Sequence, residues 1–171
     1  MKDFPVTLNE VLAARDERAA RQKKFLADFP TTVISLTIVS PGEIKRTEDS
    51  KFIADIADEY ITKTFGEKIL TKIITDKPTG YEVIYAVDLN PFQIKKITAD
   101  FENEHPLGRL MDIDVIGQDG KSVSRSEIGM ENRLCLLCGK PSAYCVKART
   151  HTLTQLQEKI KNMIAEFRQS Q

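Results

Sequence analysis

The sequence predicts an α+β fold, with a mixed or mainly antiparallel sheet packed against about four helices. Predicted helices and strands do not alternate strictly, and short turns join neighbouring strand-like runs as hairpins. The chain of 171 residues has no long internal linker, so we expect one domain over residues 1–171. Neither a GxGxxG nor a Walker A motif occurs, which argues against the common dinucleotide-binding and P-loop folds.

Composition excludes several classes of function. The chain has 25 basic and 25 acidic side chains, so we expect no nucleic-acid partner, because binding of that kind relies on excess positive charge. No apolar run reaches the roughly 18 residues of a membrane span. The N-terminus lacks the apolar stretch of a signal peptide, so we expect a cytoplasmic protein with no membrane partner.

The first half of the chain predicts a helix, a strand and a second helix. Thr7 and Glu10 have the spacing of a capping box, so a helix is expected to follow to about residue 27. Residues 32–39 are rich in β-branched side chains, as strands are. Apolar residues at helical spacing then predict a helix over about 49–64.

The second half predicts strands, two helices and an irregular segment. Residues 69–75 and 81–89 are expected to pair as a hairpin across a turn-rich linker, 76–80. Asn90 and Pro91 are typical of a helix start, and this helix should end before His105. Residues 126–150 show no clear periodicity. The remaining predicted elements are a strand over 109–116, a short return strand near Ser122 and a final helix capped by Thr152.

Two aspartates on the predicted strand 109–116 form the first candidate site. Asp112 and Asp114 are separated by one residue, so both point to the same face, about 7 Å apart along the strand. Two carboxylates this close favour a divalent cation between them, and Mg²⁺ with phosphate oxygens suits such a site. The alternative is an ordinary half-exposed strand with a solvated acidic face.

Basic residues supply candidate phosphate contacts. Arg109 directly precedes the aspartate pair, and Lys45 with Arg46 follows a strand and a Pro-Gly break. Each could bind phosphate or could be an ordinary surface charge. Arg15, Arg18 and Arg21 recur every three residues along the first predicted helix, and this stripe could bind an acidic partner or be a solvated helix face.

Three cysteines and a histidine form the second candidate site. Cys135 and Cys138 have the spacing of a chelating pair, and Cys145 with His151 would complete a tetrahedral shell for structural Zn²⁺. Ordinary packing of the cysteines and redox chemistry are the alternatives. An odd number of cysteines in a reducing compartment argues against a disulfide framework.

These motifs together carry a resemblance to a known family. The segment Gly108 to Val115, the Cys135–Gly139 pair region, and the Ala148–His151 stretch occur in order along the chain. The early Glu10–Arg15 segment and the strand leading to Pro41-Gly42 also fit. On these segments the chain resembles the apo-citrate lyase phosphoribosyl-dephospho-CoA transferases, also called holo-citrate lyase acyl-carrier-protein synthases.

The resemblance implies a nucleotidyl transfer. The family moves a 2′-(5″-phosphoribosyl)-3′-dephospho-CoA group from its triphosphate precursor to a serine of the citrate lyase acyl carrier (gamma) subunit. The serine hydroxyl attacks the α-phosphorus, and pyrophosphate leaves. A nucleotidyltransferase-like fold is compatible with this chemistry, although the Gly-Ser element typical of that superfamily is not evident in the sequence.

The resemblance also implies roles for the candidate residues. Asp112 and Asp114 would be the catalytic carboxylates that hold Mg²⁺ against the triphosphate, and Asp88 is a candidate third carboxylate. Arg109 and the Lys45-Arg46 pair would neutralise phosphate charge. The alternative from a different class is a non-catalytic, zinc-stabilised module that binds an acidic carrier protein through the arginine stripe.

Overall fold

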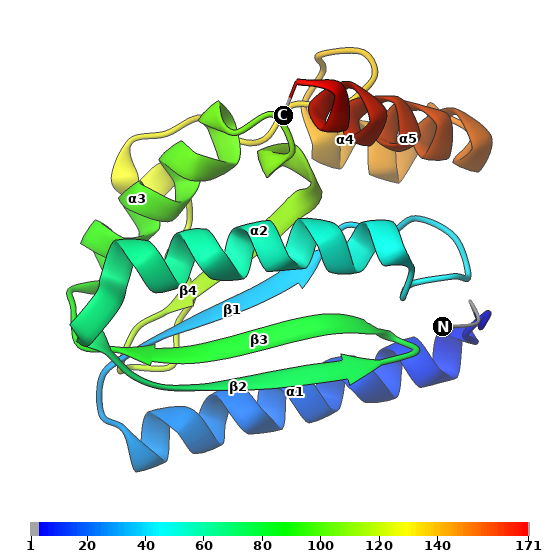
Figure 1. The fold of residues 1–171 in the computed structure, drawn as a ribbon. Helices are drawn as coiled ribbons and strands as arrows, with labels where there is room; N and C mark the ends of the chain where they lie inside the picture. Colours follow the sequence, from blue (N-terminus) through cyan, green and yellow to red (C-terminus); the bar gives the residue numbers. More distant parts are fainter. Residues whose placement is uncertain (1–3, 171) are drawn as a thin grey trace.

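The computed structural model describes residues 4–170 and contains one four-stranded sheet flanked by helices (Figure 1). The strands are β1 (Thr32–Ile38), β2 (Ile69–Lys77), β3 (Gly80–Val87) and β4 (Met111–Ile116), in the order β2-β3-β1-β4. Every pairing is antiparallel, as expected. The helices are α1 (Leu8–Asp28), α2 (Glu48–Phe65), α3 (Pro91–Glu104), α4 (Ser142–Ala148) and α5 (Leu153–Gln169). None of the helices in this part of the chain is long and apolar enough to cross a membrane.

Helices cover both faces of the sheet. In Figure 1, α1 lies below the sheet, while α2 and α3 lie above it. The side chains of β1 alternate accordingly: Ile34 and Leu36 join the main core under α2 and α3, and Val33 packs toward Phe25 and Leu26 of α1. The α+β prediction is therefore confirmed, and the core forms where alternate strand residues meet the apolar helix faces.

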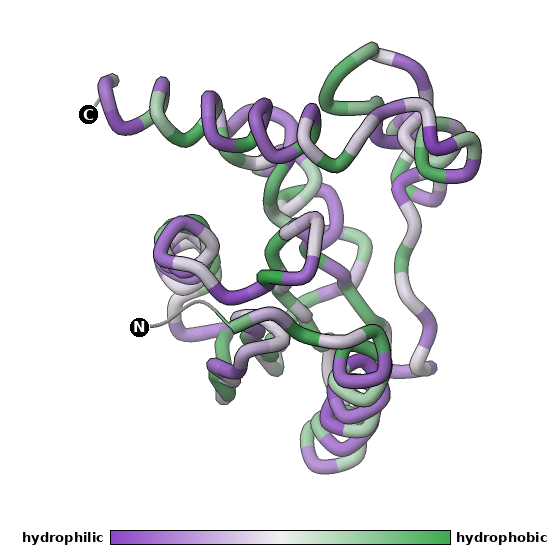
Figure 2. Tube along the Cα trace, turned by 90° about the vertical axis from the view of Figure 1, so that its right-hand side faces the viewer, coloured by the Kyte–Doolittle hydropathy of each residue, from purple (hydrophilic) through white to green (hydrophobic). Residues whose placement is uncertain are grey.

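Helix α5 packs against the start of α2. The rings of Phe52 and Phe167 are 6.2 Å apart, and Arg168 forms an ion pair of 2.9 Å with Asp49. Along α5, hydrophilic and hydrophobic segments alternate (Figure 2), because only one side of this helix contacts the rest of the protein. Because α5 directly follows the Cys-rich segment, this packing also holds the end of that segment next to the rest of the protein.

Several boundaries and one helix differ from the expectation. The hairpin turn contains only Pro78 and Thr79, because β2 and β3 both extend into the expected linker. The strand expected from residue 109 begins at Met111, after a 3₁₀ turn over Gly108–Leu110. The return strand is one isolated bridge, Ile116 to Ser122. Helix α4 is the one helix beyond the four that the sequence predicts, and its seven residues are too few to show a period in the sequence.

The connection from α3 to β4 has no room for a side chain at Gly108. A Cβ there would lie 2.5 Å from the carbonyl oxygen of Glu102 and 2.7 Å from that of Phe101. We expect Gly108→Ala to destabilise the protein by about 1–3 kcal/mol, as overpacking does, and to lower its melting temperature. Thermal denaturation measures this change, and an unchanged melting temperature would contradict the close approach.

Candidate functional site

Strand β4 presents its two aspartates on one face, as alternation predicts. In the register with β1, Asp112 lies opposite Thr37 and Asp114 opposite Ser35, whereas Ile113 is buried in the core. Both carboxylates line a cavity of about 380 Å³ beside β4. We call this cavity the β4 hollow; its lining includes Lys95, Asp112, Asp114, Arg125, Arg133 and Ser142.

A buried glutamate of α3 organises the cations of the β4 hollow. Glu102 is fully buried and accepts hydrogen bonds from Arg125 at 2.6 Å and from Arg133. The same carboxylate accepts the backbone N–H of Ile113 at 2.9 Å. Because one buried anion holds both guanidinium groups, the two arginines are fixed next to β4.

Lys95 of α3 makes a second contact with the outer edge of β4. It is buried and donates to the carbonyl oxygen of Ile113 at 3.0 Å. Burial lowers the pKa of Lys95, whereas the charges of Glu102 and Asp114 oppose that shift. Lys95 and Glu102 therefore satisfy both outward-facing backbone groups of Ile113 on an edge strand.

The two aspartates have different surroundings. Asp112 lies 3.3 Å from the guanidinium of Arg133. Asp114 is reached by solvent, but the surrounding protein partly desolvates its carboxyl group, and this burial raises its pKa. The charge of Asp112 raises that pKa further. A cation bound between the carboxylates would relieve their repulsion.

The other candidate phosphate contacts and the candidate third carboxylate lie elsewhere. Arg46 forms an ion pair with Asp76 of β2, the opposite edge strand from β4. Lys45 donates to the carbonyl oxygen of Ser40 at 2.7 Å, and burial lowers its pKa. Asp88 lines a separate cavity at the end of β3. The structure does not bring these three residues together with Asp112 and Asp114.

Arg109 lies closer to the candidate centre. Its guanidinium donates to the carbonyl oxygen of Leu134 and lines a second cavity, of about 520 Å³, next to the β4 hollow. Arg133 and Ser142 line both cavities, so the two adjoin. Arg109 is thus placed beside the aspartate pair but not on it.

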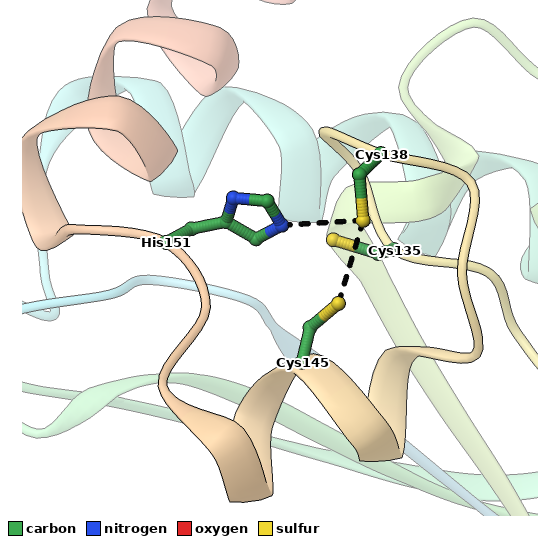
Figure 3. Close-up of side chains that lie close together, drawn as sticks. All are labelled: Cys135, Cys138, Cys145 and His151. Carbon is green, nitrogen blue, oxygen red and sulfur yellow. Dashed lines mark hydrogen bonds between the residues drawn. The ribbon is translucent and has the colours of Figure 1, made fainter.

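The cysteines and the histidine form one cluster. The sulfurs of Cys135, Cys138 and Cys145 and the ring of His151 point toward one another (Figure 3), and their ligand atoms all lie within 4.8 Å of one another. The Cys138 sulfur is 3.5 Å from that of Cys145 and 3.3 Å from His151 Nε2. Such a Cys₃His set can bind a metal ion such as zinc.

The chain fold brings these four ligands together. Backbone hydrogen bonds from Cys135 to Lys140 and from Ser142 to Arg133 close the loop that contains the first pair. Cys145 is buried on α4, and His151 lies in the link between α4 and α5. Burial and the neighbouring sulfurs raise the pKa of Cys145 to about 11, so a bound cation would have to displace its proton.

The arginine stripe of α1 is divided by its contacts. Arg18 and Arg21 each form a 2.5 Å ion pair with Glu82 of β3, so they attach α1 to the sheet. Arg15 remains on the exposed side of the helix. Two of the three arginines thus have a structural role rather than a free surface for an acidic partner.

Sequence reasoning missed Lys95 and Glu102 as members of the site, and it considered Arg125 and Arg133 as basic positions without linking them to the aspartates. One signal was present: Lys95 and Glu102 are seven residues apart and Thr98 lies between them, so all three share one side of α3. Charged residues so close to the apolar face of a helix indicate a buried polar contact. The partners of Glu102 come from an irregular segment and could not be identified by spacing.

Several known proteins that this chain resembles carry the same description. The family model "Apo-citrate lyase phosphoribosyl-dephospho-CoA transferase" matches residues 6–167. A protein of that description from Shigella flexneri serotype 5b (strain 8401) is 33% identical over 162 residues, covering 93% of this chain and 88% of the relative. One from Citrobacter koseri is 35% identical over 154 residues, covering 88% and 84%. The chain therefore belongs to the apo-citrate lyase phosphoribosyl-dephospho-CoA transferase family.

Proposed function

We propose that the β4 hollow is the centre at which this chain carries out the activity of its family, transfer of a phosphoribosyl-dephospho-CoA group to apo-citrate lyase. The observation that carries the proposal is the pair Asp112 and Asp114 on one strand face beside arginines fixed by a buried glutamate. Carboxylates and fixed cations in one cavity suit a reaction in which a polyphosphate must be held and its charge neutralised.

The proposed reaction is an in-line displacement at phosphorus. The hydroxyl oxygen of a serine on the acyl carrier (gamma) subunit of citrate lyase forms a bond to the α-phosphorus of triphosphoribosyl-dephospho-CoA. The bond between that phosphorus and the bridging oxygen breaks, and pyrophosphate leaves with the electron pair. The serine proton passes to solvent in the open hollow, and the carboxylates of Asp112 and Asp114 favour its loss.

The donor set of the hollow fits Mg²⁺. Asp112 and Asp114 offer carboxylate oxygens on one face, which is the ligand type that Mg²⁺ takes alongside phosphate oxygens. When bound, the ion would polarise the phosphoryl oxygens and offset charge on the leaving group. Arg125 and Arg133 line the same hollow and would add positive charge beside the bound phosphates. Arg109 would act at the far edge of the bound donor.

The Cys₃His cluster is proposed to hold a structural zinc ion. Its ligands join the loop containing Cys135, helix α4 and the link before α5. Arg133, near that loop, and Ser142, at the start of α4, line the β4 hollow. Zinc at this place would fix Arg133 and Ser142 relative to β4. No open coordination position is required for that role.

Zinc analysis gives a direct prediction for the cluster. Protein purified without chelators is expected to contain about one zinc per chain by elemental analysis, and Cys145→Ser should bind zinc at least ~100-fold more weakly, because loss of an outer-shell partner alone costs 10–100-fold. Its melting temperature should fall as well. Lys147→Ala, an exposed change on the same helix, controls for α4 itself. Parent protein without stoichiometric zinc would contradict the proposal.

A mass measurement tests the proposed reaction. Incubation of the protein with apo acyl carrier subunit, triphosphoribosyl-dephospho-CoA and Mg²⁺ is expected to add one phosphoribosyl-dephospho-CoA group to the carrier and release one pyrophosphate. A parallel reaction with a malonate decarboxylase carrier would establish carrier choice. An unmodified citrate lyase carrier under all these conditions would contradict the proposal.

A further inference from the structure

The second cavity, which we call the apolar cavity, differs in chemistry from the β4 hollow. Its volume is about 520 Å³, and apolar side chains from three segments form most of its walls. Leu134 comes from the Cys-rich loop, Val146 from α4, and Leu156 with Ile160 from α5. A concave, mostly apolar site with a few charged groups is the usual form of a small-molecule site.

Two of the three arginines at this cavity, Arg109 and Arg149, form no ion pair with an acidic side chain within the described residues. Arg109 and Arg149 both line it, and no carboxylate is among its lining residues. Arg149 forms no ion pair or side-chain hydrogen bond within residues 4–170, in contrast to Arg125 and Arg133 on Glu102. Arg109 and Arg149 therefore offer positive charge at a cavity whose lining contains no carboxylate but shares Cys135, Cys145 and His151 with the Cys₃His cluster.

The backbone at Arg149 supports a role for its side chain. Arg149 has φ 49°, and it is the only residue other than glycine with positive φ in the described part of the chain. Glycine usually occupies this position after a helix, since it adopts the left-handed region without strain. Arginine at this position places a guanidinium at the cavity, and its positive φ costs conformational free energy that glycine would not.

We propose that the apolar cavity binds the dephospho-CoA portion of the donor while the β4 hollow binds its triphosphate. This inference rests on the proposed function for the nature of the donor. Dephospho-CoA combines an uncharged adenine ring and pantetheine arm with a diphosphate, which matches apolar walls beside Arg109 and Arg149. Arg133 and Ser142 line both cavities, so the two sites adjoin and an extended donor would span them.

Binding of the two halves of the donor tests this arrangement without transfer. Calorimetric titration is done with dephospho-CoA as one probe and inorganic tripolyphosphate with Mg²⁺ as the other. Val146→Glu places a negative charge at the cavity on a residue that is 78% exposed, so the fold should tolerate it. We expect dephospho-CoA to bind this variant at least ~10-fold more weakly, with tripolyphosphate binding unchanged. Arg149→Gln should act in the same direction.

Controls separate this inference from the proposed function. Ala148→Glu adds the same charge to the same helix at an exposed residue that does not line the cavity, and its affinity for dephospho-CoA should equal that of the parent. Absence of dephospho-CoA binding to the parent, equal loss in Val146→Glu and Ala148→Glu, or equal loss for both probes would overturn the inference. Selective loss in Val146→Glu would support it even if the carrier were never modified.

Discussion

Asp112→Asn and Asp114→Asn are each expected to slow transfer to the carrier by at least about 100-fold without lowering thermal stability. A hundredfold loss corresponds to about 2.7 kcal/mol of transition-state stabilisation, which is a modest demand on a carboxylate that holds a metal ion against a triphosphate. Rates from intact carrier mass, measured beside melting temperatures, provide the comparison.

The stability half of this prediction follows from the surroundings of Asp114. Burial and the charge of Asp112 raise the pKa of Asp114 in the folded protein. At a pH above that pKa, the ionised carboxylate therefore destabilises the folded state relative to the unfolded chain. Asparagine removes this cost, so the melting temperature of Asp114→Asn should equal or slightly exceed that of the parent. Residues that serve function at the expense of stability show this pattern.

A charge control makes the result specific. Asp16 is exposed on α1, and Asp16→Asn removes one negative charge far from the β4 hollow. This variant should retain the parental rate. A full rate in Asp114→Asn, or an equal decrease in Asp16→Asn, would show that the aspartate pair is not the reactive centre.

Glu102→Ala should be the most destabilising of these substitutions. It leaves Arg125 and Arg133 without their buried anion and the N–H of Ile113 without its acceptor. Breaking a buried ion pair by removing one partner costs about 3–5 kcal/mol. At roughly 2–4 °C per kcal/mol for a protein of this size, the melting temperature should fall by roughly 6–20 °C.

Glu102 acts by positioning the arginines, so its conservative variant should separate its structural and functional effects. Glu102→Gln keeps the shape and can still accept from Ile113, and it should recover part of the stability. It should still raise the KM for the donor, because the arginines lose the anion that orients them. Glu104→Ala, on the same helix but exposed, should match the parent in both measurements. Equal behaviour of the variants at 102 and 104 would contradict the role of Glu102.

Features set by local interactions were predictable from the sequence. Capping residues Thr7, Asn90 and Thr152 mark the helix starts found in the structure, because a cap depends on residues within one turn. The shared face of Asp112 and Asp114 also followed from alternation along a strand. The residue types of the three cysteines and His151 predicted a common cluster, which the structure contains, although the spacing to His151 is irregular.

Features that depend on contacts distant in the chain were not predictable. Arg133 reaches Glu102 across 31 residues, most of them in turns and irregular segments, and no periodicity links the two. Lys45 and Arg46 follow the same strand that pairs with β4, yet Arg46 turns to Asp76 on the opposite edge strand. Strand order, which no local pattern sets, decided which charges meet in the hollow.

The most direct test of the account is a crystal structure with Mn²⁺ and the triphosphate donor, using the anomalous signal to locate the ion. We expect a manganese peak between the carboxylates of Asp112 and Asp114, with the triphosphate facing Arg125 and Arg133. A donor and metal bound instead at the cavity beside Asp88, with the β4 hollow empty, would contradict it.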